Sequence, residues 1–140
     1  MQYDHYVARI KIDESDMRTE VVQQVELSSQ VMRQASDLKW QVERQKQKLE
    51  EVEALTLLKV KEDITKKRTV DEVKALVCTY PDVTSAKKKL IDMKEEHDQW
   101  SILSESYRNR GYALRELVEI HGQERTSDPA TIAESRMARR

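Results

Sequence analysis

The stretch from Pro81 to His121 constrains the fold most, because an apolar repeat with a period of seven residues runs through it for about six repeats. One seam of this repeat is apolar or amphipathic at every step and consists of Ala86, Met93, Trp100, Tyr107, Leu114 and His121. The other seam is more mixed and consists of Val83, Leu90, His97, Ser104, Gly111 and Val118. So narrow an apolar stripe predicts a long helix that packs against other helices.

The ends of this helix have sequence signals of their own. Pro81 suits the first turn of a helix, and Asp82 beside it favours the positive end of the helix dipole. Gly122 is where we expect the helix to end. A helix of about 40 residues is roughly 60 Å long, which is too long for a compact bundle of one chain of this size. It therefore needs a partner, either the other long helix of the chain or a second copy.

A second long helix is predicted from the Asp13–Asp16 segment, which offers capping residues, to about Lys67, because this stretch contains neither Gly nor Pro. Its apolar residues recur at spacings of three, four and seven: Met17, Val21, Val25, Met32, Ala35, Leu38, Val42, Leu49, Val52 and Leu55. Ser28 and Gln45 interrupt the stripe. Trp40 lies off this stripe. Its ring either contacts another helix or stacks on a nucleic-acid base.

Between the long helices, Thr69 followed three residues later by Glu72 matches a capping box. It predicts a short helix at about 70–77 that ends before Tyr80-Pro81. The expected fold is therefore all-α: two long helices, expected to lie antiparallel, are joined by a short helix in an extended helical hairpin.

The two ends of the chain differ from the helical part. Residues 1–14 are predicted to form an N-terminal arm, in which Tyr6 to Ile12 alternate weakly between apolar and polar and suggest a short extended segment. Residues 15–122 form the predicted helical assembly domain. Residues 123–140 are expected to be a flexible tail that ends in Arg136, Arg139 and Arg140.

Composition narrows the function classes. Charged residues make up 36% and hydrophobic residues 38% of the 140 residues, so the apolar supply is thin for a large core, and oligomerisation is the expected way to bury the seams. The net charge of −1 argues against strong binding to nucleic acid unless basic residues cluster. The single cysteine, Cys78, excludes a disulfide within the chain and suits a reducing cytosol. We expect neither a signal peptide nor a membrane-spanning segment.

Templates for enzyme sites find no match. Gly111 and Gly122 are isolated, so no phosphate-binding glycine loop is present, and the three histidines lack the spacing of metal ligands. We therefore expect no catalysis, cofactor or metal. The remaining function class is a binding protein that contacts its ligand through basic side chains. Each basic cluster is also consistent with a solvent-exposed helix face without a ligand. The clusters are Lys59 and Lys61; Lys66, Lys67 and Arg68; Lys87, Lys88 and Lys89; Arg108, Arg110 and Arg115.

The segment Arg110-Gly111-Tyr112-Ala113-Leu114, with Trp100 upstream, resembles the recombination mediator proteins of large tailed phages, the UvsY family. The likeness extends upstream through Glu72, Lys74, Asp82-Val83 and Leu90. In looser form it includes Leu58-Lys59-Val60-Lys61-Glu62-Asp63 and Ile12-Asp13, and so covers about residues 12–121. The chain departs from the family where Ile64 to Thr69 replaces a glycine-rich insertion, and in its longer tail.

The resemblance implies a non-enzymatic protein that binds single-stranded DNA and assembles as a hexameric or heptameric homo-oligomeric ring. It would load the phage recombinase onto strands coated by single-strand binding protein, in recombination, repair and replication in the host cytoplasm. Lys59 and Lys61 correspond by position to the family's basic DNA-contact pair, and Lys66, Lys67 and Arg68 adjoin them. The rival interpretation, a coiled-coil scaffold or tether with no nucleic-acid role, agrees equally well with composition and heptads.

Overall fold

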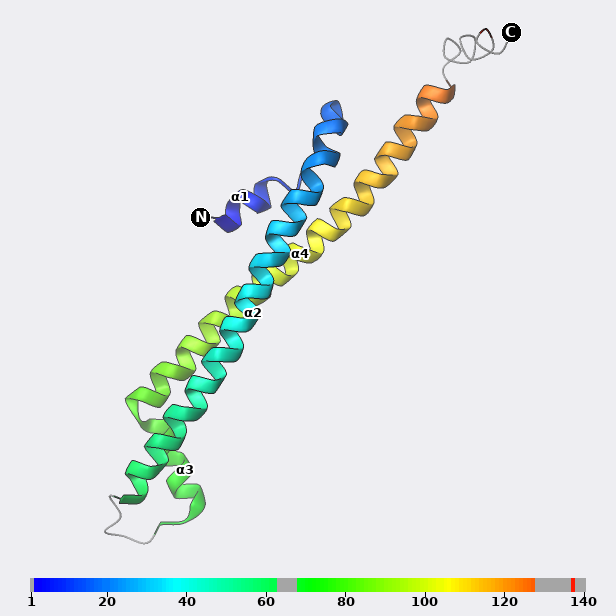
Figure 1. Ribbon diagram of the computed structural model, residues 1–140. Helices are drawn as coiled ribbons and strands as arrows, with labels where there is room; N and C mark the ends of the chain where they lie inside the picture. Colours follow the sequence, from blue (N-terminus) through cyan, green and yellow to red (C-terminus); the bar gives the residue numbers. More distant parts are fainter. Residues whose placement is uncertain (1, 63–67, 128–136, 138–140) are drawn as a thin grey trace. The chain divides into compact units, whose positions relative to one another are not determined.

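The computed structural model describes residues 2–62, 68–127 and 137, and within these ranges it contains helices and no strand. The elements are α1 (Gln2–Ala8), the 3-10 helix η1 (Glu14–Asp16), α2 (Met17–Glu62), α3 (Val70–Thr79) and α4 (Pro81–Ser127) (Figure 1). The prediction of two long helices joined by a short one is confirmed. Of the helices described, none combines the length and the apolar character needed to cross a membrane.

The chain divides into two compact units, and α2 and α4 contribute to both. Unit 1 combines Met1–Met32 with Ile102–Arg140, and unit 2 is Arg33–Ser101. Within unit 1, Gln24 of α2 bonds the backbone of Tyr107 while Glu20 bonds Arg110, so α2 and α4 run antiparallel. They are also antiparallel within unit 2, where Gln45 bonds the backbone of Ala86.

The core of unit 2 closes the corner where α2, α3 and α4 meet. Val60 of α2, Val73 and Val77 of α3 and Val83 of α4 are buried together. Partly buried apolar residues pack around them: Leu49, Val52, Leu57, Leu76 and Tyr80. This cluster fixes the last turn of α2 against the other two helices, because each buried Val removes apolar surface from water.

The start and end of α3 follow the sequence signals. The Thr69 side chain accepts a hydrogen bond from the backbone N of Glu72 at 3.3 Å, and the Glu72 carboxylate accepts one from the backbone N of Thr69 at 3.1 Å. The predicted capping box is thus confirmed. Tyr80 adopts extended backbone angles, as the residue before a proline prefers, and α4 begins at Pro81.

The expected extended segment in the N-terminal arm is wrong, because residues 2–8 form α1. A helix satisfies its own backbone hydrogen bonds, whereas an extended arm needs a strand beside it, and the described residues supply none. The Tyr6 ring packs edge-on against the Tyr107 ring of α4, with ring centres 6.4 Å apart. The weak alternation from Tyr6 to Ile12 therefore reflects contacts of a helix and the turn after it.

Gly122 does not end α4, contrary to the sequence-based expectation, since the helix continues to Ser127. Neither glycine has a positive φ, the backbone angle that a glycine cap adopts. The tail predicted to begin at residue 123 is therefore helical to 127. Its arginines at 136, 139 and 140 lie outside the described residues.

Replacing Gly122 by Ala should raise the free energy of unfolding by about 0.5–1 kcal/mol, because Ala favours the helix over Gly. A Cβ at this position meets nothing within 4 Å, whereas a Cβ at Gly111 lies 3.1 Å from Nε2 of Gln24. Gly111→Ala should therefore gain less. Urea denaturation followed by circular dichroism measures both. A loss of stability in Gly122→Ala would mean that α4 ends at this glycine after all.

Candidate nucleic-acid interface

The basic pair Lys59 and Lys61 lies on the last turn of α2, on either side of the buried Val60. Val60 is 2% exposed, whereas both lysines are exposed. Residues two apart on a helix point about 200° apart. Burial of Val60 therefore directs the two ammonium groups to opposite sides of α2, and the core of unit 2 holds them there.

Of the adjoining basic residues, Arg68 is exposed just before the capping box of α3, while Lys66 and Lys67 lie outside the described residues. Between positions 59 and 74 the sequence holds six Lys or Arg and four Asp or Glu residues, a local excess of positive charge in a chain of net charge −1. Among the residues that the structure describes, none forms an ion pair with Lys59, Lys61 or Arg68.

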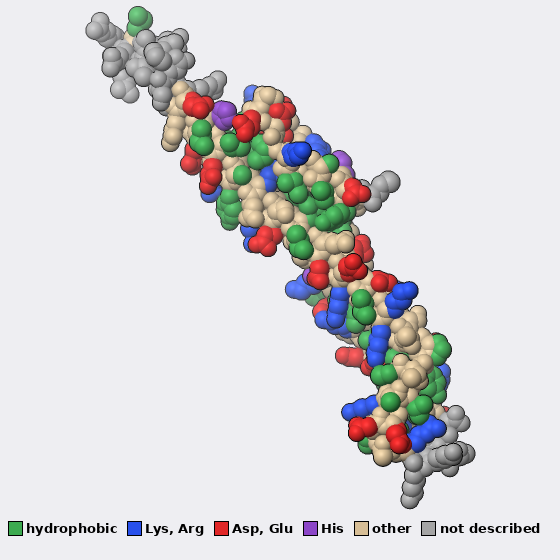
Figure 2. Space-filling view, turned by 180° about the vertical axis from the view of Figure 1, so that it is seen from behind, with side chains coloured by type: hydrophobic (Ala, Val, Ile, Leu, Met, Phe, Trp, Pro, Cys, Tyr) green, Lys and Arg blue, Asp and Glu red, His purple; other side chains and the backbone are tan. Residues whose placement is uncertain are grey.

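The run of three lysines on α4 does not act as one cluster. Lys87 folds back, with its Nζ 3.7 Å from Oε1 of Glu53 and 3.4 Å from Sγ of Cys78, and only Lys88 and Lys89 extend into solvent. On the face seen in Figure 2, basic side chains are interspersed with acidic ones along the surface. A strand would therefore meet local sites on this face, not a uniform basic stripe.

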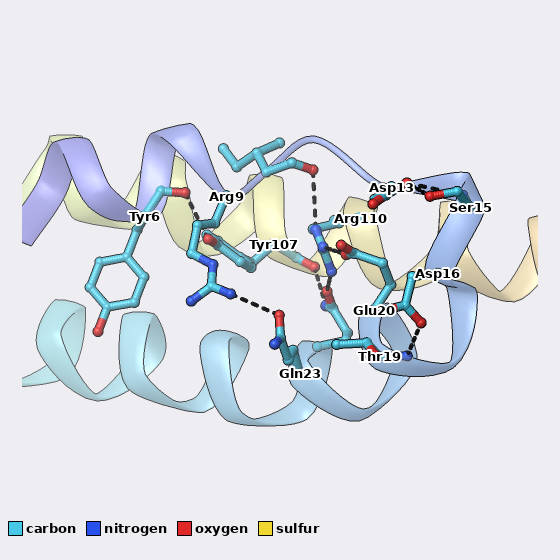
Figure 3. Close-up of polar contacts among 12 residues, drawn as sticks. Tyr6, Arg9, Asp13, Ser15, Asp16, Thr19, Glu20, Gln23, Tyr107 and Arg110 are labelled. Atoms are coloured by element: carbon cyan, nitrogen blue, oxygen red, sulfur yellow. Dashed lines mark hydrogen bonds and ion pairs between the residues drawn. The ribbon is translucent and has the colours of Figure 1, made fainter.

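The third basic cluster contains a residue that sequence reasoning misplaced. Arg108 and Arg115 are exposed, but Arg110 is 4% exposed and lies in the interior of unit 1 (Figure 3). Its guanidinium forms an ion pair with Glu20. The Nη1 group donates a hydrogen bond to Oε1 of Gln24 at 2.6 Å, and Nε donates one to the carbonyl oxygen of Ile10 at 3.1 Å. Arg110 therefore joins the N-terminal arm, α2 and α4, and is unavailable for a phosphate.

Gln24 and Tyr107 extend this polar cluster on both sides. Gln24 donates from Nε2 to the carbonyl oxygen of Tyr107 at 2.7 Å, and the Tyr107 hydroxyl donates to the carbonyl oxygen of Tyr6 at 2.7 Å. Gly111 leaves room for the Gln24 side chain, since a Cβ at this position would lie 3.1 Å from Nε2 of Gln24. The sequence offered one signal, Glu20 and Gln24 at a spacing of four on one helix face.

The histidines of α4, Cys78 and the two tryptophans were also singled out in the sequence. His97 is half-buried beside Ser101, His121 is partly exposed near Glu124, and the Cys78 side chain is exposed. Within the described ranges, no three His, Cys, Asp or Glu residues lie together in a way that would hold a metal ion. Trp40 is 63% exposed, in contrast to Trp100, which is 4% exposed.

No protein-family model, curated protein or solved structure matches the chain. The relation to recombination mediators therefore stays a prediction from the residues quoted above.

Removing the charge of Glu20 should strongly destabilise the protein, because the Arg110 guanidinium would then be buried without a counter-charge. We expect Glu20→Gln to lower the free energy of unfolding by about 3–5 kcal/mol, measured by urea denaturation. Arg108→Gln, at an exposed position on the same helix, is the matched control and should change it by less than about 0.5 kcal/mol. Equal effects of the two substitutions would contradict a structural role for the pair.

Alkaline pH should weaken the contact of Tyr107 with the arm. Burial raises the pKa of the Tyr107 hydroxyl, an effect that the nearby Arg110 charge partly offsets. A pKa raised on folding means that the unfolded chain loses this proton first. The stabilisation is therefore complete below the usual tyrosine pKa of about 10 and is lost as pH rises through the higher folded-state value.

The corresponding measurement is urea denaturation between pH 8 and pH 11. Tyr107→Phe should be less stable at pH 8, by about 1 kcal/mol for the lost hydrogen bond, and should lose less stability than the native chain above pH 10. Tyr112→Phe, at an exposed position, should behave like the native chain. Identical pH profiles for the native chain and Tyr107→Phe would contradict the assignment.

Proposed function

We propose that this chain is a non-enzymatic recombination mediator that binds single-stranded DNA as a homo-oligomer. The observation that carries the proposal is the basic pair Lys59 and Lys61 at the end of α2, where buried Val60 fixes two exposed lysines. These are the positions that the resemblance to the UvsY family marks for DNA contact. The all-helical architecture agrees with that resemblance.

Assembly is supported by apolar surface on unit 1. Eight large apolar side chains of this unit, outside α1, are between 44% and 75% exposed: Val21, Val22, Val25, Met32, Ile102, Tyr112, Val118 and Ile120. A groove of about 440 Å³ between α2 and α4 is lined by several of these and by Gly111 and Leu114. Val21, Val25 and Val118 lie together in this groove, and a contiguous exposed apolar patch is typical of a contact site for another protein.

An oligomer also accounts for binding by a chain with a net charge of −1. Each subunit of the proposed ring of six or seven presents the same few cations, so one strand meets many phosphate contacts at once. In this proposal the oligomer promotes loading of the phage recombinase, in the host cytoplasm, onto strands coated by single-strand binding protein. The alternative function is a helical scaffold without a nucleic-acid role, which the exposed apolar residues of unit 1 favour equally.

Fluorescence anisotropy of a labelled single-stranded oligonucleotide, at several salt concentrations, tests the proposal. We expect salt-sensitive binding, with a logarithmic salt slope that falls by about 1.4 in Lys59→Ala/Lys61→Ala, since each phosphate contact on a single strand contributes about 0.7. Lys88→Ala/Lys89→Ala removes the same charge from exposed positions of unit 2 and is the control. An absence of binding by the native chain at low salt would leave the scaffold as the function.

A further inference from the structure

A second basic site lies between α2 and α4 within unit 2, away from the sequence-predicted lysines. It is a groove of about 280 Å³, here called the lysine groove. Its lining is almost entirely charged or polar and consists of Lys39, Val42, Glu43, Lys46, Lys94, His97 and Asp98. Three of these side chains are lysines, and they come from two helices that converge on one depression.

The charges in the lysine groove do not cancel. Lys46 pairs with Glu43 at 2.7 Å, and Nδ1 of His97 lies 3.5 Å from a carboxylate oxygen of Asp98. Lys39 and Lys94 have no ion-pair partner among the described side chains. Both lie close enough to Glu43 to lower its pKa, together with the larger effect of Lys46. With His97 uncharged, three lysines and two carboxylates give the groove a net charge of +1, which favours an anion, and Lys39 and Lys94 are its lysines without an ion-pair partner in the described part of the chain.

Trp40 adjoins two of the residues that line this groove. It follows Lys39 in the chain and precedes Glu43 by three residues, a spacing that places two side chains side by side on a helix. Leu38 and Val42, two residues away on either side, are 3% and 6% exposed, so the core of unit 2 is filled without the indole. Trp40 itself is 63% exposed.

We propose that the lysine groove and Trp40 form a second contact for the single strand, in which Lys39 and Lys94 bind phosphates and a base stacks on the Trp40 indole. A cationic groove beside an exposed aromatic ring is how proteins hold single strands without reading their sequence. The inference rests on the proposed function and adds residues to it. A helix of a second copy suits the groove less well, because it would bury the ammonium groups of Lys39 and Lys94, which have no ion-pair partner among the described residues.

Tryptophan fluorescence tests stacking on Trp40 directly, in a titration of the protein with a twenty-nucleotide oligothymidine. Trp100 is buried, so it supplies a constant background. We expect the oligonucleotide to quench the emission of the native chain and to leave that of Trp40→Phe nearly unchanged. Trp40→Ala should raise Kd about tenfold, since stacking of one base typically contributes this much or more.

The lysines are tested by the salt dependence of the same binding. Lys39→Ala/Lys94→Ala should lower the logarithmic salt slope by about 1.4, and the control Lys88→Ala/Lys89→Ala should leave it unchanged. Circular dichroism verifies that each variant keeps its helices.

Three outcomes would overturn the inference, and they separate it from the proposed function. If the native chain binds but Trp40→Ala and the lysine variant bind equally well, the strand lies elsewhere and the proposed function stands. If Trp40→Ala elutes as a smaller species in gel filtration without DNA, the indole is a contact between copies. If the native chain does not bind the oligonucleotide, both proposals fail.

Discussion

Neither α2 nor α4 carries enough apolar surface to be stable alone, and each depends on burying a narrow stripe against the other. Long charged helices gain most of their stability in water from such packing and little from intrinsic propensity. In unit 2 the stripe supplies Leu38, Val42 and Leu90, and in unit 1 it supplies Leu27, Val31 and Leu114. Every exposed feature described above, including both basic sites, is positioned by this pairing.

Polar residues within the stripe set which turns of the two helices face each other. Gln45 and Arg110 are 5% and 4% exposed, and each bonds an atom outside its own helix. An apolar stripe alone tolerates a shift of one heptad, because Val and Leu recur at equivalent positions. A shift would leave Gln45 and the guanidinium of Arg110 without partners, which is costly in a buried place.

The helices and the capping box were read correctly from local sequence signals, whereas two weaker local signals and the long-range contacts were not. Thr69 and Glu72 predicted the start of α3 because a capping box involves four neighbouring residues. Gly122 and the arm misled, since a glycine near a helix end and a weak alternation each suit two structures. Arg110 was grouped with exposed arginines because periodicity does not reveal that an arm 100 residues away will cover it. The lysine groove was likewise invisible, because it forms where Lys39 and Lys94 meet across two helices.

The bond between Arg110 and Ile10 also fixes an order of events during synthesis. The arm leaves the ribosome before α4, and its bond to Arg110 cannot form until that residue, 100 positions later, has been made. Contacts between residues so distant in sequence form late, because a long loop must close before they contribute. Until then the arm can contact only α2, through Tyr6 with Gln30 and Arg9 with Gln23, and the nascent protein exposes the surface that Tyr107 later covers.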